Sequence, residues 1–536
     1  MDATAGSARS PGTTATTRSP ATGTVVKRHS VVTRLTHWIG ALAMLVLVMS
    51  GFAIFDAAPY LDASDLSSPA HRILNIGAET TVAGTPRGVT EIFGHKFDTT
   101  HLLGITSDGQ GGEAERAFPG WITFPGYQDL ADGRRWHLFF GWVLVIVGTL
   151  YLFFGALRKE IPLLVVRPSD FPKMLPMQLY YFKLRAEPPP HGKYNPLQKA
   201  GYTVLLFGIV PFVILTGLAL SPGIDAIATP LTALLGGRQF ARTWHFIAML
   251  ALIGFTFGHV FLVAATGVLN NMRSMTLGTY RLGKKRRHRT MKRQLFIASS
   301  MAAALSGCAS VTNGLNDNPT VHGALKVAED LNHAVIGTHG RAKLYSEADI
   351  TRNFPTNGDD TPSDATYRGI TGHGFASYAL PIGGLVEHPQ TLGLRALRAM
   401  ATLSEITRHD CVEGWSVVGK WRGVPLGNLL KVVRPKPEAR YVVFYSFDHD
   451  SNGQQFYGSV DLAQAAHPQT QLALDLNGAP IDAAHGGPAR LRIPTQLAYK
   501  STKWVQRMEL VSTFKPIFGG NGGYWEDQGY EWYAGI

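Results

Sequence analysis

Four long apolar runs occupy the first half of the sequence and limit what this chain can fold into. They cover about residues Leu35–Phe55, His137–Ala156, Ala200–Leu220 and His245–Leu269. Each run is close to the ~20 residues that an α-helix needs to cross the hydrocarbon core of a bilayer. From about residue 312 the chain reads as an ordinary soluble domain, so the mean hydropathy of +0.03 averages two unlike halves. The sequence predicts a multidomain protein that begins with an all-α transmembrane four-helix bundle in a lipid bilayer.

Lys and Arg residues orient the four helices. Lys27, Arg28 and Arg34 precede the first run, a Lys- and Arg-rich connection joins the second to the third, and a basic block from Arg281 to Arg293 follows the fourth. Connections of this kind usually stay in the cytoplasm. We therefore expect residues 56–136 and 221–244 to face outward. The same block accounts for much of the net charge of +12, and no recognition motif accompanies it, so we expect no nucleic-acid partner.

Four histidines in or beside these runs fall into two pairs by depth. His37 and His259 lie toward the inner face, and His137 and His245 lie toward the outer face. His245 and His259 are 14 residues apart, which is ~21 Å along a helix and close to four full turns. Two bis-imidazole sites stacked across one bilayer are what electron transfer between haems requires.

A simpler alternative is that histidines at helix ends lie in the interface between lipid and water. For His37 or His137 alone this alternative has equal weight, whereas four histidines at two matching depths favour haem ligation. His71, His95 and His101 in the outer connection lack this geometry and are expected to be ordinary surface residues.

Three motifs in this half resemble a known family. Arg34-Leu-Thr-His-Trp38, Arg135-Trp-His137 and Lys193-Tyr-Asn-Pro-Leu-Gln-Lys199 are similar to the di-haem cytochrome b subunits of membrane-bound hydrogenases, formate dehydrogenases and thiosulfate reductases. The resemblance covers about residues 28–275 and includes all four ligand positions. It implies two b haems and electron exchange with a membrane quinone or quinol.

The junction after the basic block has two interpretations. Met291-Lys-Arg-Gln, an apolar stretch from Leu295 to Leu305 and Ser306-Gly-Cys308 form the pattern of a bacterial lipoprotein signal, which predicts cleavage and lipidation at Cys308. The same residues could instead form a short fifth membrane helix of ~17 residues, and we slightly favour this intact tether. Lys292-Arg293 also weakly resembles a twin-arginine export signal. Each interpretation carries the chain outward.

From Thr312 onward, short runs bounded by Gly, Pro and Asn predict strands. Tyr378–Ile382, Tyr441–Tyr445 and Gln471–Leu474 are examples, and they indicate an α+β domain. Cys411 lies in this part of the chain, and an isolated cysteine is by default a small buried apolar residue. Its flanking residues favour a different role for it.

The segment Thr407–Leu426, which contains Cys411-Val-Glu-Gly-Trp-Ser416, resembles the molybdenum-cysteine region of the sulfite-oxidase fold. The similarity is greatest to the branch of periplasmic methionine-sulfoxide reductase catalytic subunits, and it covers about residues 345–536. It implies a molybdenum-molybdopterin cofactor with Cys411 as catalytic residue and molybdenum ligand, which suits a soft thiolate. The resemblance implies further cofactor contacts at Asn357, His485, Arg490, Lys500, Ser501 and Lys503.

These interpretations divide the chain into five parts. They are a disordered N-terminus at residues 1–24, a four-span di-haem cytochrome b domain at 25–290, the internal signal-like segment or fifth helix at 291–311, a linker at 312–344, and the molybdopterin oxidoreductase domain at 345–536. The expected location is the bacterial inner membrane, with several spans and the C-terminal domain on the periplasmic side. Whether the chain forms a homo-oligomer stays open.

Three functions remain in competition at this point. The first is a quinol-linked reductase that removes an oxygen atom from a small oxidised substrate such as a sulfoxide. The second is the reverse flow, in which sulfite or a related compound is oxidised and quinone is reduced, with Arg408, His409, Lys420 and Arg422 as an anion pocket. The third is an electron-transfer cytochrome whose soluble domain only docks to a partner.

Overall fold

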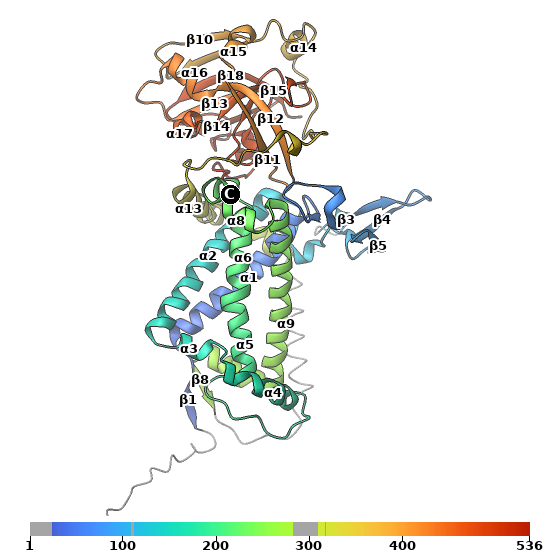
Figure 1. The fold of residues 1–536 in the computed structure, drawn as a ribbon, viewed down its shortest axis with the longest axis vertical. Coiled ribbons are helices and arrows are strands. Elements are labelled where there is room, and N and C mark those ends of the chain that lie inside the picture. Colours follow the sequence, from blue (N-terminus) through green and yellow to red (C-terminus); the bar gives the residue numbers. More distant parts are fainter. Residues whose placement is uncertain (1–23, 109–111, 282–308, 317) are drawn as a thin grey trace, which may run out of the picture.

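The computed structural model describes residues 24–108, 112–281, 309–316 and 318–536. A bundle of long helices forms the lower part of the molecule, and a β-rich domain lies above one end of the bundle (Figure 1). Nearly all of the predicted disordered N-terminus and most of the internal signal-like segment, including Cys308, lie outside the described residues.

Among the described residues, four helices are long and apolar enough to cross a membrane, as predicted. They are α1 (Val31–Phe55), α2 (Leu130–Leu157), a continuous helix made of α5 (Pro196–Val204), a π-helical turn (Leu205–Ile209) and α6 (Val210–Leu218), and α9 (Arg238–Thr276). Figure 1 shows them side by side. The short helices α3 (Ile161–Leu164) and α4 (Met174–Tyr181) lie between α2 and α5.

Two of these helices begin earlier than their apolar runs do. Helix α2 begins at Leu130, where the Asp129 side chain accepts a hydrogen bond from the backbone NH of Asp132. Helix α9 begins at Arg238, directly after Gly237 in a left-handed conformation. The apolar runs that start at His137 and His245 therefore lie inside longer helices, because each helix begins with a polar segment that hydropathy does not detect. His137 and His245 each lie seven residues inside their helix.

The outer connection between α1 and α2 is folded. Strands β2 (Tyr60–Asp62), β3 (Arg72–Thr80), β4 (Pro86–Ile92) and β5 (His95–Asp98) form an antiparallel sheet that extends sideways from the bundle (Figure 1). A second pair, β6 (Gly104–Ser107) and β7 (Glu113–Arg116), lies beside it. The buried ion pair of Arg116 with Asp56, at 2.8 Å, ties this region to the end of α1.

At the opposite end of the bundle, β1 (Val25–Lys27) pairs antiparallel with β8 (Thr279–Arg281). The predicted linker contains helices. They are α11 (Ala309–Asn316), α12 (Pro319–Leu325) and α13 (Val327–Ile336). Two tryptophans of α2 hold them, because the indole NH of Trp136 donates to Asn316 at 2.9 Å and that of Trp142 donates to Asn332 at 2.8 Å. The linker thus covers part of α2.

The upper domain contains two mainly antiparallel sheets, which confirms the predicted α+β class. One sheet has the order β10-β9-β18-β13-β14, and the other has the order β11-β12-β15-β16 with β17 paired to β15. The strands are β9 (Ala379–Gly384), β10 (Gln390–Gly393), β11 (Leu403–Asp410), β12 (Ser416–Pro425), β13 (Tyr441–His449), β14 (Gln455–Asp461), β15 (Gln471–Leu476), β16 (Ala479–Pro480), β17 (Arg490–Arg492) and β18 (Val505–Val511).

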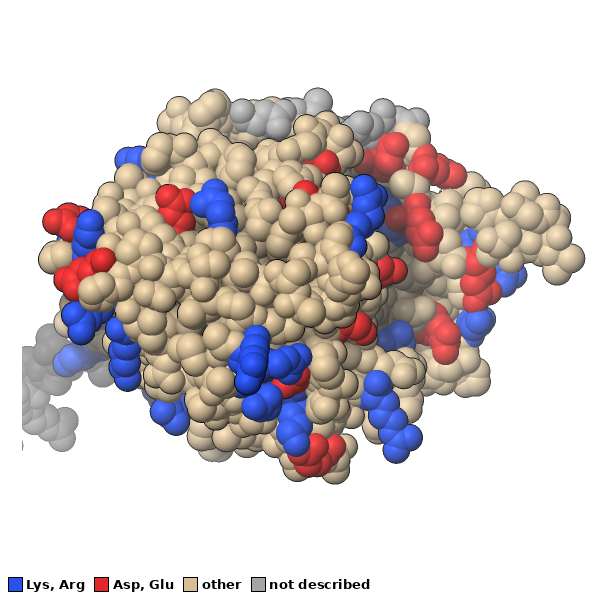
Figure 2. All heavy atoms as spheres, turned by 90° about the horizontal axis from the view of Figure 1, so that it is seen from above, with Lys and Arg blue, Asp and Glu red and all other residues tan. Residues whose placement is uncertain are grey.

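Five short helices accompany these sheets: α14 (Ala365–Thr371), α15 (Leu394–Met400), α16 (Leu426–Val433), α17 (Leu462–Ala466) and α18 (Tyr524–Asp527). Fully buried apolar side chains from both sheets and from α16, among them Leu380, Phe444, Leu474 and Leu429, form one core. On the face seen from above, acidic and basic side chains are interspersed (Figure 2).

Candidate functional site

Cys411 lies in a tight loop between two strands of the upper domain. Strand β11 ends at Asp410, strand β12 begins at Ser416, and these two residues are paired in the ladder. The Cys411 NH donates to the Trp415 carbonyl at 2.9 Å, and the Gly414 NH donates to the Cys411 carbonyl at 3.1 Å. Gly414 has a φ of +117°, which favours glycine. We call residues 411–415 the cysteine loop.

The thiol of Cys411 is buried, with 3% of the residue exposed. The Asn357 side-chain NH₂ lies 3.6 Å from Sγ, and a Glu413 carboxylate oxygen lies 3.7 Å from it. Burial and the Glu413 carboxylate raise the pKa of the Cys411 thiol to about 12. Without a metal the thiol therefore keeps its proton, and a bound metal ion would displace that proton because the thiolate is the ligand.

Most of the predicted cofactor contacts gather around this thiol. Arg490 donates to the His485 carbonyl at 2.9 Å and to the Ser501 carbonyl at 3.4 Å. The Lys503 ammonium group donates to the Asn357 carbonyl at 3.2 Å. Asn357, His485, Arg490, Ser501 and Lys503 thus form one cluster with Cys411.

The side chain of Lys500 is directed elsewhere. Its ammonium group forms an ion pair with Glu526, and both side chains are almost completely buried. Lys500 ends the 3₁₀ turn Ala498–Lys500, and its side chain lies over the Trp532 ring, 5.4 Å from the ring centroid. The ammonium group of Lys500 therefore has a carboxylate partner of its own.

Two observations test whether this cluster fits an anionic cofactor. The Arg490 guanidinium is buried and its hydrogen bonds go to neutral carbonyl groups, with no carboxylate in ion-pair distance among the described residues. The buried hydroxyl of Ser501 has no hydrogen-bond partner among those residues either. A buried cation and a buried hydroxyl of this kind are costly unless a further group satisfies them, and a phosphate tail would do so. The residues present fit the cofactor.

The four residues considered for an anion pocket are occupied in other ways. Arg408 is bound to three carboxylates, Lys420 pairs with Glu347 at 2.5 Å, and Arg422 pairs with Asp475 at 2.8 Å. The His409 ring lies among the rings of three aromatic residues, Phe354, Trp415 and Trp421. Burial, with Arg492 and Arg490 adding to it, holds the pKa of His409 far below its usual range. These four residues do not provide a free positive pocket.

The four histidines of the bundle lie in the two predicted pairs. The ring centroids of His37 and His259 are 6.2 Å apart, and those of His137 and His245 are 6.1 Å apart. A metal ion bound at about 2 Å from a nitrogen of each ring separates two imidazole centroids by about 6 Å. Both pairs therefore have the spacing of a bis-imidazole metal site.

Hydrogen bonds orient the outer pair. Nδ1 of His245 lies 3.0 Å from the Val213 carbonyl, which can only accept, so Nδ1 carries the proton. The Thr216 hydroxyl lies 3.1 Å from the same nitrogen, and the Ser50 hydroxyl lies 3.1 Å from Nδ1 of His137. Such partners leave Nε2 free for a metal and fix the ring orientation.

Two glycines make room for this pair. A Cβ atom at Gly217 would lie 3.1 Å from Cε1 of His245, and one at Gly51 would lie 3.6 Å from Cε1 of His137. The first distance is shorter than ordinary van der Waals contact, so a larger residue at 217 would displace the His245 ring. The bundle positions both rings closely against neighbouring helices.

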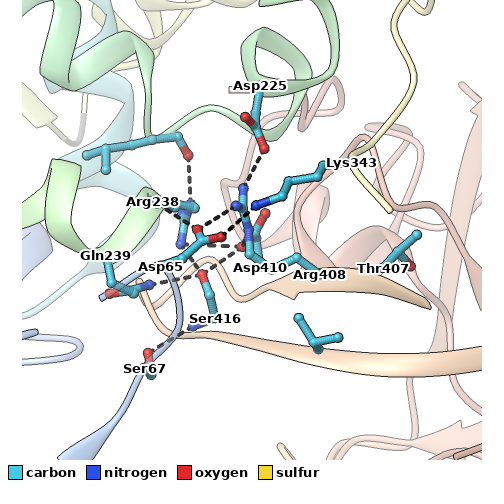
Figure 3. Close-up of polar contacts among 12 residues, drawn as sticks. Asp65, Ser67, Asp225, Arg238, Gln239, Lys343, Thr407, Arg408, Asp410 and Ser416 are labelled. Carbon is cyan, nitrogen blue, oxygen red and sulfur yellow. Dashed lines mark hydrogen bonds and ion pairs between the residues drawn. The ribbon is translucent and has the colours of Figure 1, made fainter. Parts of the chain in front are cut away.

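The bundle also contacts the cysteine loop directly. Figure 3 shows Arg238 and Gln239 of α9 beside Asp410 and Ser416, with Ser67 of the outer connection on the other side of Ser416. No motif in the sequence marks these interface residues, or Ser50, Thr216 and Glu413, as functional. The Arg-Gln pair at the start of the fourth helix is an ordinary polar sequence. Its role follows only from its contacts with the upper domain.

Comparison with known proteins accounts for both halves. The family model for prokaryotic cytochrome b561 matches residues 28–278. The putative protein-methionine-sulfoxide reductase subunit YedZ1 of Azospira oryzae is 37% identical over 254 residues, which is 45% of this chain and 87% of that protein. This chain belongs to the prokaryotic cytochrome b561 family. The predicted resemblance to cytochrome b subunits is confirmed.

This cytochrome b561 protein carries a second domain. The family model for the oxidoreductase molybdopterin-binding domain matches residues 370–518. The protein-methionine-sulfoxide reductase catalytic subunit MsrP of Xanthomonas axonopodis pv. citri is 35% identical over 150 residues, 26% of this chain and 46% of that protein. MsrP of Ralstonia nicotianae is 31% identical over 186 residues, 32% of this chain and 54% of that protein. The chain spans about half the length of these two relatives.

The cytochrome b561 protein is therefore a membrane protein with a haem b domain and a molybdopterin-dependent oxidoreductase domain on one chain. The predicted fold class and enzyme class are confirmed.

Proposed function

We propose that this chain is a membrane-bound sulfoxide reductase that passes electrons from membrane quinol through two b haems to molybdenum. The observation that carries the proposal is the direct contact between the cysteine loop and α9, the helix that holds His245. The names of the relatives support the substrate class, since one half resembles a methionine-sulfoxide reductase subunit and the other half resembles its catalytic subunit.

Each histidine pair holds one haem in this proposal. His37 and His259 ligate the inner haem, and His137 and His245 ligate the outer haem. The two centroid spacings of 6.2 and 6.1 Å support both assignments, and the Nδ1 partners of His245 support the outer one. A second b haem on the quinol side lets an electron enter at one membrane face and leave at the other.

The cysteine loop and the surrounding cluster hold the molybdenum cofactor. Cys411 provides the thiolate, and Asn357, His485, Arg490, Ser501 and Lys503 bind the pterin and its phosphate. Molybdenum bound in this way supplies oxygen-atom exchange coupled to two electrons. Reduction of a sulfoxide consumes two electrons and two protons and releases a sulfide and water. One quinol supplies the two electrons and releases two protons as it becomes quinone.

The electrostatics of the site favour an uncharged sulfoxide over sulfite. Arg408, Lys420 and Arg422 already have carboxylate partners, and Arg490 belongs to the cofactor cluster. An anionic substrate would need fixed positive charge that these residues do not offer. The positive-inside pattern supports an upper domain on the periplasmic side of a bacterial inner membrane.

Assays on the intact purified chain test this function. We expect two haem irons for each molybdenum, and oxidation of reduced viologen when methionine sulfoxide is added. Cys411→Ser should abolish this turnover while the haem spectrum is retained. Turnover of sulfite with an artificial acceptor and none of sulfoxides would contradict the proposal, and a preparation with haem but no molybdenum would leave only a docking role for the upper domain.

A further inference from the structure

The first turn of α9 is bonded to the cysteine loop. The Gln239 side-chain NH₂ donates to the Gly414 carbonyl at 2.7 Å and to the Ser416 hydroxyl at 2.9 Å. Arg238 donates to the same hydroxyl at 2.8 Å. On the other side, the Ser67 and Ser416 backbones are joined, since the Ser67 NH donates to the Ser416 carbonyl at 2.9 Å. These bonds hold the loop from two sides (Figure 3).

At the same interface, a buried arginine of each domain pairs with carboxylates of the other domain. Arg408 of the upper domain lies 3.0 Å from Asp65 and 3.0 Å from Asp225, which both belong to outer connections of the bundle. Arg238 of the bundle lies 3.8 Å from Asp410 of the upper domain. A buried charge that loses its partner is strongly destabilising, so this exchange of charges permits one register of the two domains. The charges of the two domains are thus complementary at this interface.

Helix α9, whose first residues bond to the cysteine loop, also carries His245, a proposed haem ligand. His245 follows Arg238 by seven residues, which is about 10 Å along α9 and close to two full turns. Both side chains therefore project from nearly the same side of the helix. Arg242 lies between them in sequence, and its guanidinium would lie 3.1 Å from a Cβ atom built on Gly414.

Helix α2, which carries the other outer histidine, is also attached to the upper domain. Arg134 lies three residues before His137, and its guanidinium pairs with Glu531 at 3.3 Å. The N-terminal ends of both helices that hold the outer pair are thus bonded to the upper domain. Both helices that carry the outer histidines are therefore attached to the domain that carries Cys411.

We propose that Arg238 and Gln239 are positioning residues that hold the cysteine loop against the outer histidine pair, so that electrons pass to the molybdenum site inside one fixed interface. The inference rests on the proposed function. Each transfer oxidises the outer haem by one electron and reduces the molybdenum site by one electron, and two transfers serve one quinol. Electron transfer weakens steeply with distance, so a loosened loop slows this step before it affects chemistry at molybdenum.

The variant Gln239→Met tests this role because it keeps the side-chain volume and removes both hydrogen bonds. Ser67→Ala, which removes the hydroxyl that accepts from the Ser416 NH at 3.0 Å, loosens the loop from the other side. Tyr345→Phe is the matched control. It removes the hydrogen bond of 2.8 Å that the Tyr345 hydroxyl donates to Asp65 and the one of 3.0 Å that it accepts from Arg408, neither of which involves the cysteine loop.

The intact holoenzyme is reduced with a quinol analogue, mixed with methionine sulfoxide, and followed by the absorbance of reduced haem. We expect Gln239→Met to slow haem reoxidation about ten-fold, the effect of losing one or two hydrogen bonds. Viologen-driven turnover, which bypasses the haems, should stay within about two-fold of the original protein. Ser67→Ala should slow reoxidation in the same direction, and Tyr345→Phe should leave it unchanged.

Unchanged haem reoxidation in Gln239→Met, or an equal loss of viologen-driven turnover, would overturn the inference. A measurement without substrate separates it from the proposed function. When quinol is added anaerobically, the paramagnetic signal of partly reduced molybdenum should appear promptly in the original protein and slowly in Gln239→Met. If sulfoxides are not reduced at all, the proposed function fails, and this signal still decides the positioning role.

Discussion

The guanidinium of Arg134 on α2 donates a 2.9 Å hydrogen bond to the main-chain carbonyl of Ile536. The same side chain is half-buried and pairs with Glu531, which is buried. The C-terminal segment is held further by Gly223, whose NH donates to the Gly535 carbonyl at 2.9 Å. The C-terminal residues therefore lie between the two domains and bind to both of them.

Removing the charge of Arg134 should loosen this attachment. Arg134→Ala leaves the buried Glu531 carboxylate without its partner, which costs about 3–5 kcal/mol in the free energy of unfolding. Thermal denaturation in detergent measures the loss. Arg87→Ala is the control, since its pair with Glu79 is largely exposed and contributes about 1 kcal/mol or less. Equal effects of the two substitutions would argue against a structural role for Arg134.

His245→Ala should remove the outer haem and leave the inner one. The remaining His137 cannot hold a six-coordinate haem alone, whereas His37 and His259 are not touched. We expect the haem content to fall from two to one for each chain and quinol-driven sulfoxide reduction to stop, while the inner haem is still reduced by quinol. Haem extraction and low-temperature spectra check this result.

The comparison for this variant is His71→Ala in the outer connection. His71 is exposed, and its ring contacts Ser68 at 3.2 Å. Neither haem should change in this variant. A His245→Ala protein with both low-spin haem signals would show that the proposed pairing is wrong.

Thr216→Val should weaken the outer haem without removing a ligand. The Thr216 hydroxyl donates to backbone carbonyls of its own helix and accepts from Nδ1 of His245. Loss of such a partner typically lowers metal affinity about 10–100-fold. Titration of haem-depleted protein with haem measures the change. Thr266→Val removes a hydroxyl whose hydrogen bonds go to Leu262 and Asn271 of its own helix, and this variant should bind haem normally.

The stability of the linker contact should depend on pH through His333. Its ring lies 3.6 Å from Asp461 and stacks on Tyr533. The hydrogen bond with Asp461 raises the pKa of His333 above its ordinary value of 6.5. This stabilisation is complete below about pH 6.5 and is lost as the pH rises through the raised pKa. His333→Gln should show a smaller fall in melting temperature between about pH 6 and pH 9, and an unchanged pH profile would contradict this assignment.

The sequence predicted the membrane helices and the histidine pairing because both follow from local signals. Hydropathy marks a span, and the 14 residues between His245 and His259 place both rings on one face. Hydropathy did not locate the polar N-terminal ends of α2 and α9, which carry Arg134 and Arg238. In sequence, these ends resemble any charged connection between helices.

The folded outer connection was also missed, since its strands are short and mostly half-exposed. The sequence predicts that Lys500, Ser501 and Lys503, which lie in one motif, all contact the cofactor. In the structure the chain turns at Ala498–Lys500, so the Lys500 ammonium group meets Glu526 while Lys503 reaches the Asn357 carbonyl. Contacts such as Arg238 with Ser416 join residues 178 positions apart, and no local pattern encodes them.

The ion pairs across the interface affect how fast electrons can be delivered. They join Arg408 to Asp65 and Asp225, and Arg238 to Asp410. A cytochrome and a reductase on separate chains must collide, and charged surfaces steer such encounters at rates that fall with ionic strength. Here the cytochrome and the reductase domain lie on one chain and are already in contact, and ions in solution screen buried ion pairs only weakly. Quinol-driven turnover for each haem should therefore be insensitive to added salt and to dilution of the protein.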